Sequence, residues 1–412
     1  MIVCDGPCKP RFSNLLDLQR SWTVLLVVLV SFLMHLLIVQ AAELDDSKWS
    51  SAPFISNPSS GCDPTWGSWP SVQDHGLINS QVIVFTVFPR VGNLFIALHD
   101  IIEISFNLGI AIVLDRSGFE GFKLALSTNE IRWDVDPAPF MKEVAAVKGG
   151  EDMEGERHAL LFPDGAMLLN STQLARIAEA TGTESGGVAL ADAVNRRVRY
   201  MRHLIPRIYQ SQSIQWQKLQ PCVWNMFFER SPNLVQTLVN LKPFPATSTS
   251  HAAWHIRTAD GETRLSFNHN RHPYVFVETP EQVISSYSNA MAYAASVCSA
   301  NRNTPVYLST NSPAMKAETS NQPWNVSFID LHLAPEDHHT YFTRDKKKAE
   351  LAALTDFFFL LDSTFILRPR SSFSGMVATI KGLLCSKVPG EIESHVREGM
   401  IELCFPPSTC TL

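Results

Sequence analysis

A strand–turn–helix–strand pattern in residues 81–115 restricts the fold of this chain more than any other feature of its sequence. The apolar run over 81–88, bounded by Pro89, predicts a buried strand. A helical pattern follows, ends at Gly109 and leads into a second apolar strand over 110–115. Because a connecting helix lets the two strands pair in parallel, the segment predicts a βαβ unit and therefore an α/β fold.

The same alternation of strands and helices returns from about residue 250. Strands are expected at 252–257, 305–309, 325–331 and 364–367, and helices after Thr279, from about Arg344 and over 372–384. Thr279 followed by Pro280 and Gln282 is typical of a capped helix start. We therefore expect two Rossmann-like domains facing a cleft, an N-terminal α/β domain over 76–245 and a C-terminal domain over 246–412, with ligands at the carboxyl ends of the strands.

The N-terminal region predicts a membrane anchor. Residues 22–39 are mostly apolar, and at about 1.5 Å rise per residue they nearly cross a hydrocarbon core of about 30 Å. Basic residues precede this stretch, and acidic residues follow it, which places the N-terminus in the cytosol. The expected segments are a cytosolic tail over 1–21, a transmembrane signal-anchor over 22–41 and a stem over 42–75. The alternative is a signal peptide cleaved near Ala41, although its apolar part would be unusually long.

Cysteines and sequons agree with a body in the lumen of the secretory pathway. Six of the eight cysteines follow the apolar stretch, enough for up to three disulfides of undetermined connectivity. N-glycosylation sequons begin at Asn170 and Asn325. The net charge of −6 and the lack of a basic block argue against nucleic acid as a partner. We expect a single-pass type II protein whose partners include the lipid bilayer, through residues 22–41.

The first candidate site is His255-x-Arg257-x-x-Asp260, where a predicted strand ends. An arginine there can hold a phosphate through two charge-assisted hydrogen bonds and stabilise the charge that grows on a leaving diphosphate. Asp260 or Glu262 can accept the proton of an attacking hydroxyl. The alternative for this segment alone is a surface salt bridge beside a packed histidine.

Two further turns carry the same kind of chemistry. Arg370, Ser371, Ser372 and Phe373 join a predicted strand to a helix, and free amides and hydroxyls at a helix start can bind phosphate. Gly92 and Asn93 occupy the first strand–helix turn, where a glycine lets the backbone approach a ligand closely. Ordinary helix capping by serine is the alternative for the later turn.

These segments together resemble the fucosyltransferase superfamily that contains the α1,2-, α1,6- and O-fucosyltransferases. Residues 91–95, Val-Gly-Asn-Leu-Phe, are similar to the Leu-Gly-Asn-Gln-Met-Phe opening of α1,2-fucosyltransferases, and residues 254–260 resemble the family's His-Val-Arg-Arg-x-Asp segment. Residues 306–311 and 356–374 resemble its later strand and its serine-rich turn. The resemblance covers about residues 85–115 and 250–385.

The resemblance implies a GT-B-type, inverting glycosyltransferase of the Golgi or endoplasmic reticulum that uses GDP-fucose as donor, needs no metal or other cofactor, and modifies a glycan or glycoprotein. It implies that Arg257 binds the diphosphate, that Ser371 and Ser372 contact the nucleotide, and that His255 lies beside the donor.

Two alternatives stay open. Thr258 and Asn311 stand where the family has an arginine and an acidic residue, which is compatible with a noncatalytic glycan-binding or scaffold protein of the same fold. Asp134-Val-Asp136 matches the Asp-x-Asp of metal-dependent GT-A transferases, but its mostly polar lead-in favours a solvated loop.

Overall fold

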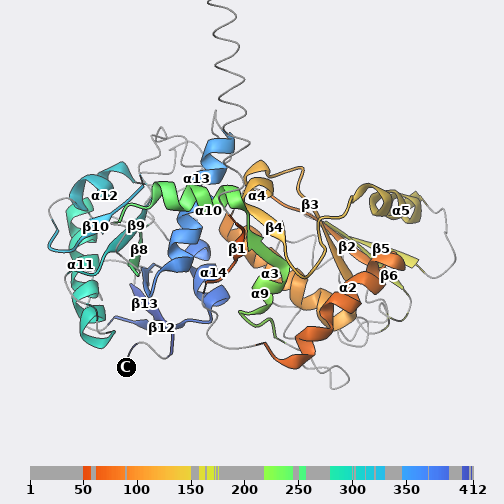
Figure 1. The fold of residues 1–412 in the computed structure, drawn as a ribbon, viewed down its shortest axis with the longest axis horizontal. Coiled ribbons are helices and arrows are strands. Elements are labelled where there is room, and N and C mark those ends of the chain that lie inside the picture. The colour runs from red at the N-terminus through yellow and green to blue at the C-terminus, as the bar shows by residue number, and fades with distance from the viewer. Residues whose placement is uncertain are drawn as a thin grey trace, which may run out of the picture. The chain divides into compact units, whose positions relative to one another are not determined.

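The computed structural model describes residues 50–56, 62–88, 91–149, 157–162, 165–170, 218–244, 250–256, 279–298, 303–310, 312–319, 322–329, 346–369, 371–388 and 401–407, and the single residues 172, 175, 300 and 410. Figure 1 shows the arrangement of its helices and strands. The predicted cytosolic tail and signal-anchor lie outside the described residues.

The largest sheet has six strands in the order β10-β9-β8-β11-β13-β12. Its strands are β8 (Ala252–Ile256), β9 (Val306–Thr310), β10 (Val326–Ser327), β11 (Ile366–Arg368), β12 (Leu384–Lys387) and β13 (Glu402–Phe405). The first four in space are parallel, β13 pairs antiparallel with β11, and β12 pairs antiparallel with β13. The sequence predicted each parallel strand, although β10 is shorter than expected.

The helices of this half follow the predicted pattern. They are α11 (Pro280–Val297), α12 (Pro313–Glu318), α13 (Lys346–Asp362) and α14 (Ser372–Lys381). The capping box at the start of α11 is confirmed, because the Thr279 hydroxyl accepts from the amide of Gln282 while the Gln282 side chain accepts from that of Thr279. The helix α14 ends three residues earlier than predicted, since Gly382 adopts a left-handed conformation with φ 65°.

The second sheet has four strands in the order β3-β2-β6-β5. Parallel pairing of β2 (Val82–Thr86) with β3 (Ala111–Asp115), connected by α3 (Val91–Leu108), confirms the predicted βαβ unit. A hairpin of β5 (Arg157–Phe162) and β6 (Gly165–Asn170) extends the sheet antiparallel to β2. The N-terminal half is thus mixed α/β with one βαβ unit among the described strands, which is less than the Rossmann-like sheet that we expected.

A third, antiparallel sheet has the order β1-β7-β4. Its strands are β1 (Ala52–Pro53), β4 (Leu126–Thr128) and β7 (Phe228–Arg230). The remaining helices are η2 (Pro64–Ser68), α2 (Trp69–Ile78), α4 (Glu120–Ala125), α5 (Ala138–Gly149), α9 (Val223–Phe227) and α10 (Pro232–Leu241).

One hydrophobic core joins the two halves. The ring of Phe95 on α3 stacks on Phe357 of α13, with centroids 4.4 Å apart, and Phe54 of the N-terminal segment meets Phe358 edge-on at 5.3 Å. Residues Ser51–Leu412 form one compact unit, so the core crosses the domain boundary predicted between 245 and 246. Among the described helices α3 is the one long and apolar enough to cross a membrane, but 78% of it is buried inside the protein, so it is a core helix.

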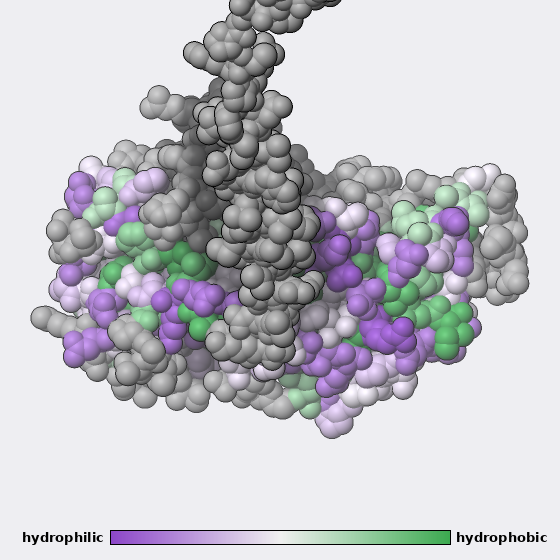
Figure 2. Space-filling view, turned by 45° about the horizontal axis from the view of Figure 1, so that its top comes forward, coloured by the Kyte–Doolittle hydropathy of each residue, from purple (hydrophilic) through white to green (hydrophobic). Residues whose placement is uncertain are grey.

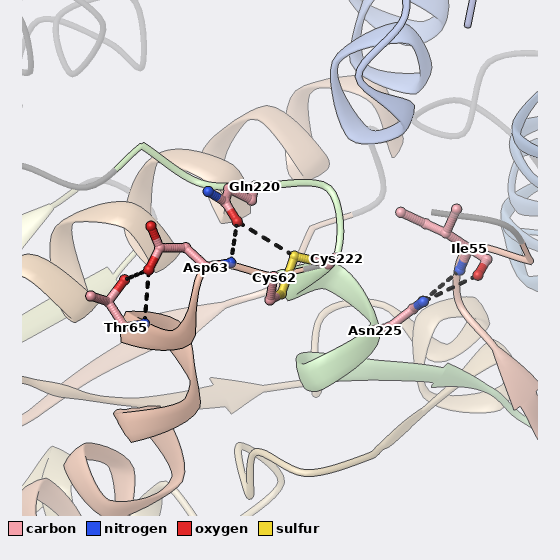
Figure 3. Close-up of a disulfide and its surroundings, with 7 residues drawn as sticks. All are labelled: Ile55, Cys62, Asp63, Thr65, Gln220, Cys222 and Asn225. Atoms are coloured by element: carbon pink, nitrogen blue, oxygen red, sulfur yellow. Dashed lines mark hydrogen bonds between the residues drawn. A yellow bond between two sulfur atoms is a disulfide. The ribbon is translucent and has the colours of Figure 1, made fainter. Parts of the chain in front are cut away.

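The prediction of a stem over 42–75 is wrong for the described part of that segment. Trp66 and Trp69 are fully buried and stack on Phe106 with centroids 4.1 and 4.9 Å away. Figure 3 shows a disulfide from Cys62 to Cys222 in the same region. The segment lacks hydrophobic periodicity, which suggested a solvated linker, but its few aromatic rings are large enough to fix it in the core.

All six cysteines that follow residue 42 form disulfides. The pairs are Cys62–Cys222, Cys298–Cys410 and Cys385–Cys404. Large exposed apolar side chains among the described residues are few and lie on four different elements: Ile78, Met141, Val239 and Leu384. Figure 2 shows the same mixture on one face, where hydrophilic residues interrupt the hydrophobic areas.

Candidate functional site

The carboxyl ends of three adjacent parallel strands form the frame of the candidate site. In register, His255 of β8 lies opposite Ser309 of β9, and Leu367 of β11 lies opposite Trp254 of β8. Arg368, the last residue of β11, therefore ends at the level of His255. Strands β8 and β11 thus end side by side, as the position of ligands in α/β proteins requires.

The turn after β11 leads directly into α14. Ser371 is the N-cap in an extended conformation, and its hydroxyl accepts from the amide of Phe373 at 3.3 Å, as the capping alternative predicts. The amide of Gly375 donates to the Ser371 carbonyl at 2.8 Å. Among the residues that the structure describes, no acceptor contacts the backbone amides of Ser372 and Ser374. Capping therefore satisfies one donor of the helix start and leaves others open to an anion.

The start of α3 packs directly against the start of α14. A Cβ atom added to Gly92 would lie 2.7 Å from the Phe373 Cα and 2.8 Å from its amide nitrogen, which is closer than real Cβ contacts allow. Gly92 is therefore required by close helix packing rather than by an unusual φ. Asn93 and Ser372 are exposed next to this contact, whereas Gly92 and Ser371 are buried. Two helix N-termini thus meet at one place, and their dipoles favour the same charge there.

His255 joins β8 to the start of α14. Its Nδ1 lies 2.8 Å from the Ser374 Oγ, and its ring lies 5.4 Å from that of Phe373. The Tyr287 hydroxyl donates to the His255 carbonyl at 2.7 Å. With 6% of its surface exposed, His255 is a packed histidine that fixes α14 to the sheet edge. The structure thus brings Gly92, Asn93, His255 and Ser371–Phe373 together.

The other predicted site residues lie outside the described residues. They are Arg257, Asp260, Glu262 and Arg370. Ile256, the residue before Arg257, ends β8 and is fully buried. Of the predicted glycosylation sites, Asn325 is exposed beside the edge strand β10, and Asn170 is the last residue of β6.

A polar cluster that the sequence analysis missed lies on the face of the sheet that also carries His255. Tyr307 donates to Oδ1 of Asp356 on α13, and Ser309 donates to Oδ2 at 3.2 Å. Burial raises the pKa of Asp356 to about 6, because the hydrogen bonds from Tyr307 and Ser309 and the charge of Lys316 compensate only in part. The signal was a lone aspartate inside the apolar run 354–361, aligned with two hydroxyls at alternate positions of a strand.

The Asp-x-Asp segment forms an exposed loop, as the mostly polar residues before Asp134 predict. Both Asp134 and Asp136 are exposed, and Asp136 accepts from the amide of Ala138 at 3.0 Å at the start of α5. Its carboxylate is thus engaged in a turn that leads into a helix.

The solved structures to which the chain is similar include fucosyltransferases. NodZ α-1,6-fucosyltransferase soaked with GDP-fucose has 12% sequence identity and a TM-score of 0.44, covering 79% of this chain and 99% of its own. The fucosyltransferase NodZ from Bradyrhizobium has 12% identity and a TM-score of 0.43, covering 79% and 98%. A variant of Arabidopsis thaliana FUT1 in complex with GDP has 8% identity and a TM-score of 0.39, covering 84% and 92%.

In sequence, no model of a protein family and no curated protein matches the chain. At such low identities and TM-scores the chemistry must be argued from this chain's own residues.

Proposed function

We propose that this protein is an inverting, metal-independent glycosyltransferase that transfers fucose from GDP-fucose to a hydroxyl of a glycan or glycoprotein. In this reaction the acceptor hydroxyl attacks the anomeric carbon from the face opposite the diphosphate. The bond from that carbon to the diphosphate oxygen breaks, and the acceptor proton passes to a base. The largest demand on the protein is to stabilise the negative charge that develops on the leaving GDP.

One observation carries the proposal: three segments from distant parts of the chain meet at the start of α14. Gly92 packs on Phe373, and His255 bonds to Ser374. The meeting point combines two helix N-termini, open amides and the strand end that precedes Arg257. Such a combination suits a diphosphate, which needs several donors arranged around its oxygens.

Each site residue receives a role under this proposal. Arg257 and Arg370 neutralise the diphosphate, while the amides of Ser372 and Ser374 and the hydroxyls of Ser371 and Ser372 donate to its oxygens. Gly92 allows the close approach of α3 to α14, Asn93 contacts the donor, and His255 and Phe373 shape the wall beside it. The residue that accepts the acceptor proton is Asp260 or Glu262.

The proposal places the body in the lumen of the Golgi or endoplasmic reticulum, anchored by residues 22–41. Three disulfides support an oxidising compartment, because cytosolic thiols are kept reduced. Carbohydrate on the exposed Asn325, detected as a loss of mass on enzymatic deglycosylation, is the observation that checks this topology.

The test of the proposed function is GDP binding by residues 43–412, which include the whole compact unit Ser51–Leu412. We expect calorimetry to give a dissociation constant below about 1 mM. The Arg257→Ala variant should weaken binding by at least about 30-fold, since losing one member of a charged pair costs about 2–5 kcal/mol. The exposed Arg132→Ala is the matched control and should bind as the unaltered chain does.

The same preparation separates the alternatives. Release of GDP from GDP-fucose with an acceptor, unaffected by a chelator and by Asp134→Ala, agrees with the proposal. Activity that disappears under either treatment indicates a metal-dependent GT-A-type enzyme instead. A folded chain that binds no nucleoside diphosphate would be the scaffold protein.

A further inference from the structure

The guanidinium of Arg368 lies beneath the helix start that the proposed function assigns to the diphosphate. Its Nη2 forms an ion pair with Oε2 of Glu402 at 2.6 Å. Its Nε donates to the Cys404 sulfur at 3.1 Å, and its Nη1 donates to the Ser371 carbonyl at 3.4 Å. Both charged side chains are largely buried, each with 14% of its surface exposed. One guanidinium therefore links β11, β13 and the N-cap of α14.

The first turn of α14 is also in contact with this guanidinium. A Cβ atom at Gly375 would lie 3.0 Å from the Arg368 Nη1, so only a small residue fits at this position without displacing the arginine. The opposite side of the same turn packs against Gly92 of α3. The turn that carries the open amides is thus held between α3 and a largely buried arginine.

The position of Glu402 is itself fixed by strand pairing. Glu402 lies opposite Arg368 in the antiparallel β11–β13 pair and opposite Lys387 in the β12–β13 pair. The Cys385–Cys404 disulfide joins β12 to β13 two residues away. The carboxylate therefore sits on a strand whose register is secured from both sides.

A cation near a helix N-terminus is unfavourable for the helix by itself, because the dipole is positive at that end. Glu402 offsets this cost through its ion pair with the guanidinium. The fork geometry of arginine allows several directed contacts at once, which an ammonium group cannot reproduce. The Arg368–Glu402 pair is therefore suited to orienting the Ser371–Ser374 turn more than to adding positive charge beside it.

We propose that Arg368 and Glu402 are positioning residues for the diphosphate, acting through the Ser371–Ser374 turn whose amides they hold in place. This inference rests on the proposed function. It assigns to Arg368 and Glu402 the affinity of the site for the leaving GDP. Neither residue needs to touch the ligand.

The test is Arg368→Lys in residues 43–412, a change that keeps the positive charge and removes the fork. We expect GDP affinity to fall by at least about 10-fold, as the loss of one or two oriented hydrogen bonds implies. Amide hydrogen exchange in the peptide that covers 371–376 should accelerate. Arg132→Lys, at an exposed position, should change neither measurement.

Glu402→Gln serves as the second variant, because it keeps the side-chain shape and removes the negative charge. Positioning predicts weaker GDP binding in this variant as well. Stronger binding would mean that Glu402 only lowers the local positive potential and would overturn the proposal, as would an Arg368→Lys variant that binds GDP and exchanges like the unaltered chain. If the unaltered chain binds no nucleoside diphosphate, the proposed function fails, and the exchange measurement alone decides whether Arg368 orients the turn.

Discussion

At the scale of single residues, Asp356 contributes to the dependence of stability on pH. Burial raises its pKa from 3.8 to about 6, so the folded state holds the proton more tightly than the unfolded state between these values. This extra stability is present below the lower value and is lost as the pH rises through the higher one. At neutral pH the folded protein therefore carries a partly buried carboxylate whose cost is at most about 3 kcal/mol.

We predict that Asp356→Asn raises the free energy of unfolding at pH 7.5, by up to this amount, and by less at pH 5. Its amide can still accept from Tyr307 and reach Ser309. The measurement is chemical denaturation at both pH values, with the exposed Asp134→Asn as control. Equal effects at the two pH values would show that Asp356 does not titrate in this range.

At the scale of elements, the contact between α3 and α14 decides the geometry of the site. Gly92→Ala should force the two helix starts apart, because its Cβ would lie 2.7 Å from the Phe373 Cα. We expect a loss of about 1–3 kcal/mol in stability, as for other overpacked sites, and weaker GDP binding. Both are measured on residues 43–412, by denaturation and calorimetry.

The matched control for this variant is Gly149→Ala at the end of α5, where no atom lies within 4 Å of the added Cβ. It should leave stability and binding nearly unchanged. If Gly92→Ala binds GDP as tightly as the unaltered chain, the contact between α3 and α14 does not set the geometry of the GDP site.

At the scale of the whole molecule, the described residues of the segment 51–75 belong to the folded body. The Phe54 carbonyl accepts from Arg230 at 2.9 Å, and Arg230 pairs with Asp362 of α13 at 2.6 Å. Burial favours the neutral form of Asp362, but the charge of Arg230 and its hydrogen bonds outweigh this effect and lower its pKa. Two fully buried tryptophans, Trp66 and Trp69, belong to the same segment.

We predict that a chain truncated to residues 76–412 does not fold, whereas residues 43–412 do. Each large buried aromatic side chain contributes about 3–5 kcal/mol, and a whole domain has only about 5–15 kcal/mol of net stability. Circular dichroism during thermal unfolding is the measurement. A cooperative transition at the same temperature in both chains would show that the segment contributes no stability.

The sequence by itself determined the elements with strong local signals. The apolar run before Pro89, the capping box at Thr279 and the serine N-cap of α14 depend on neighbours within a few residues, so local chemistry fixed them. The same reasoning failed for the predicted stem, because burial of Trp66 depends on Phe106, which is distant in sequence.

Only the tertiary structure decided which of these signals meet. The approach of Gly92 to Phe373, the bond from His255 to Ser374, and the contacts of Arg368 and Asp356 join residues that no periodicity connects. A sequence pattern reports which face of an element is apolar, whereas the partner of a buried polar group is chosen by the packing of the whole chain.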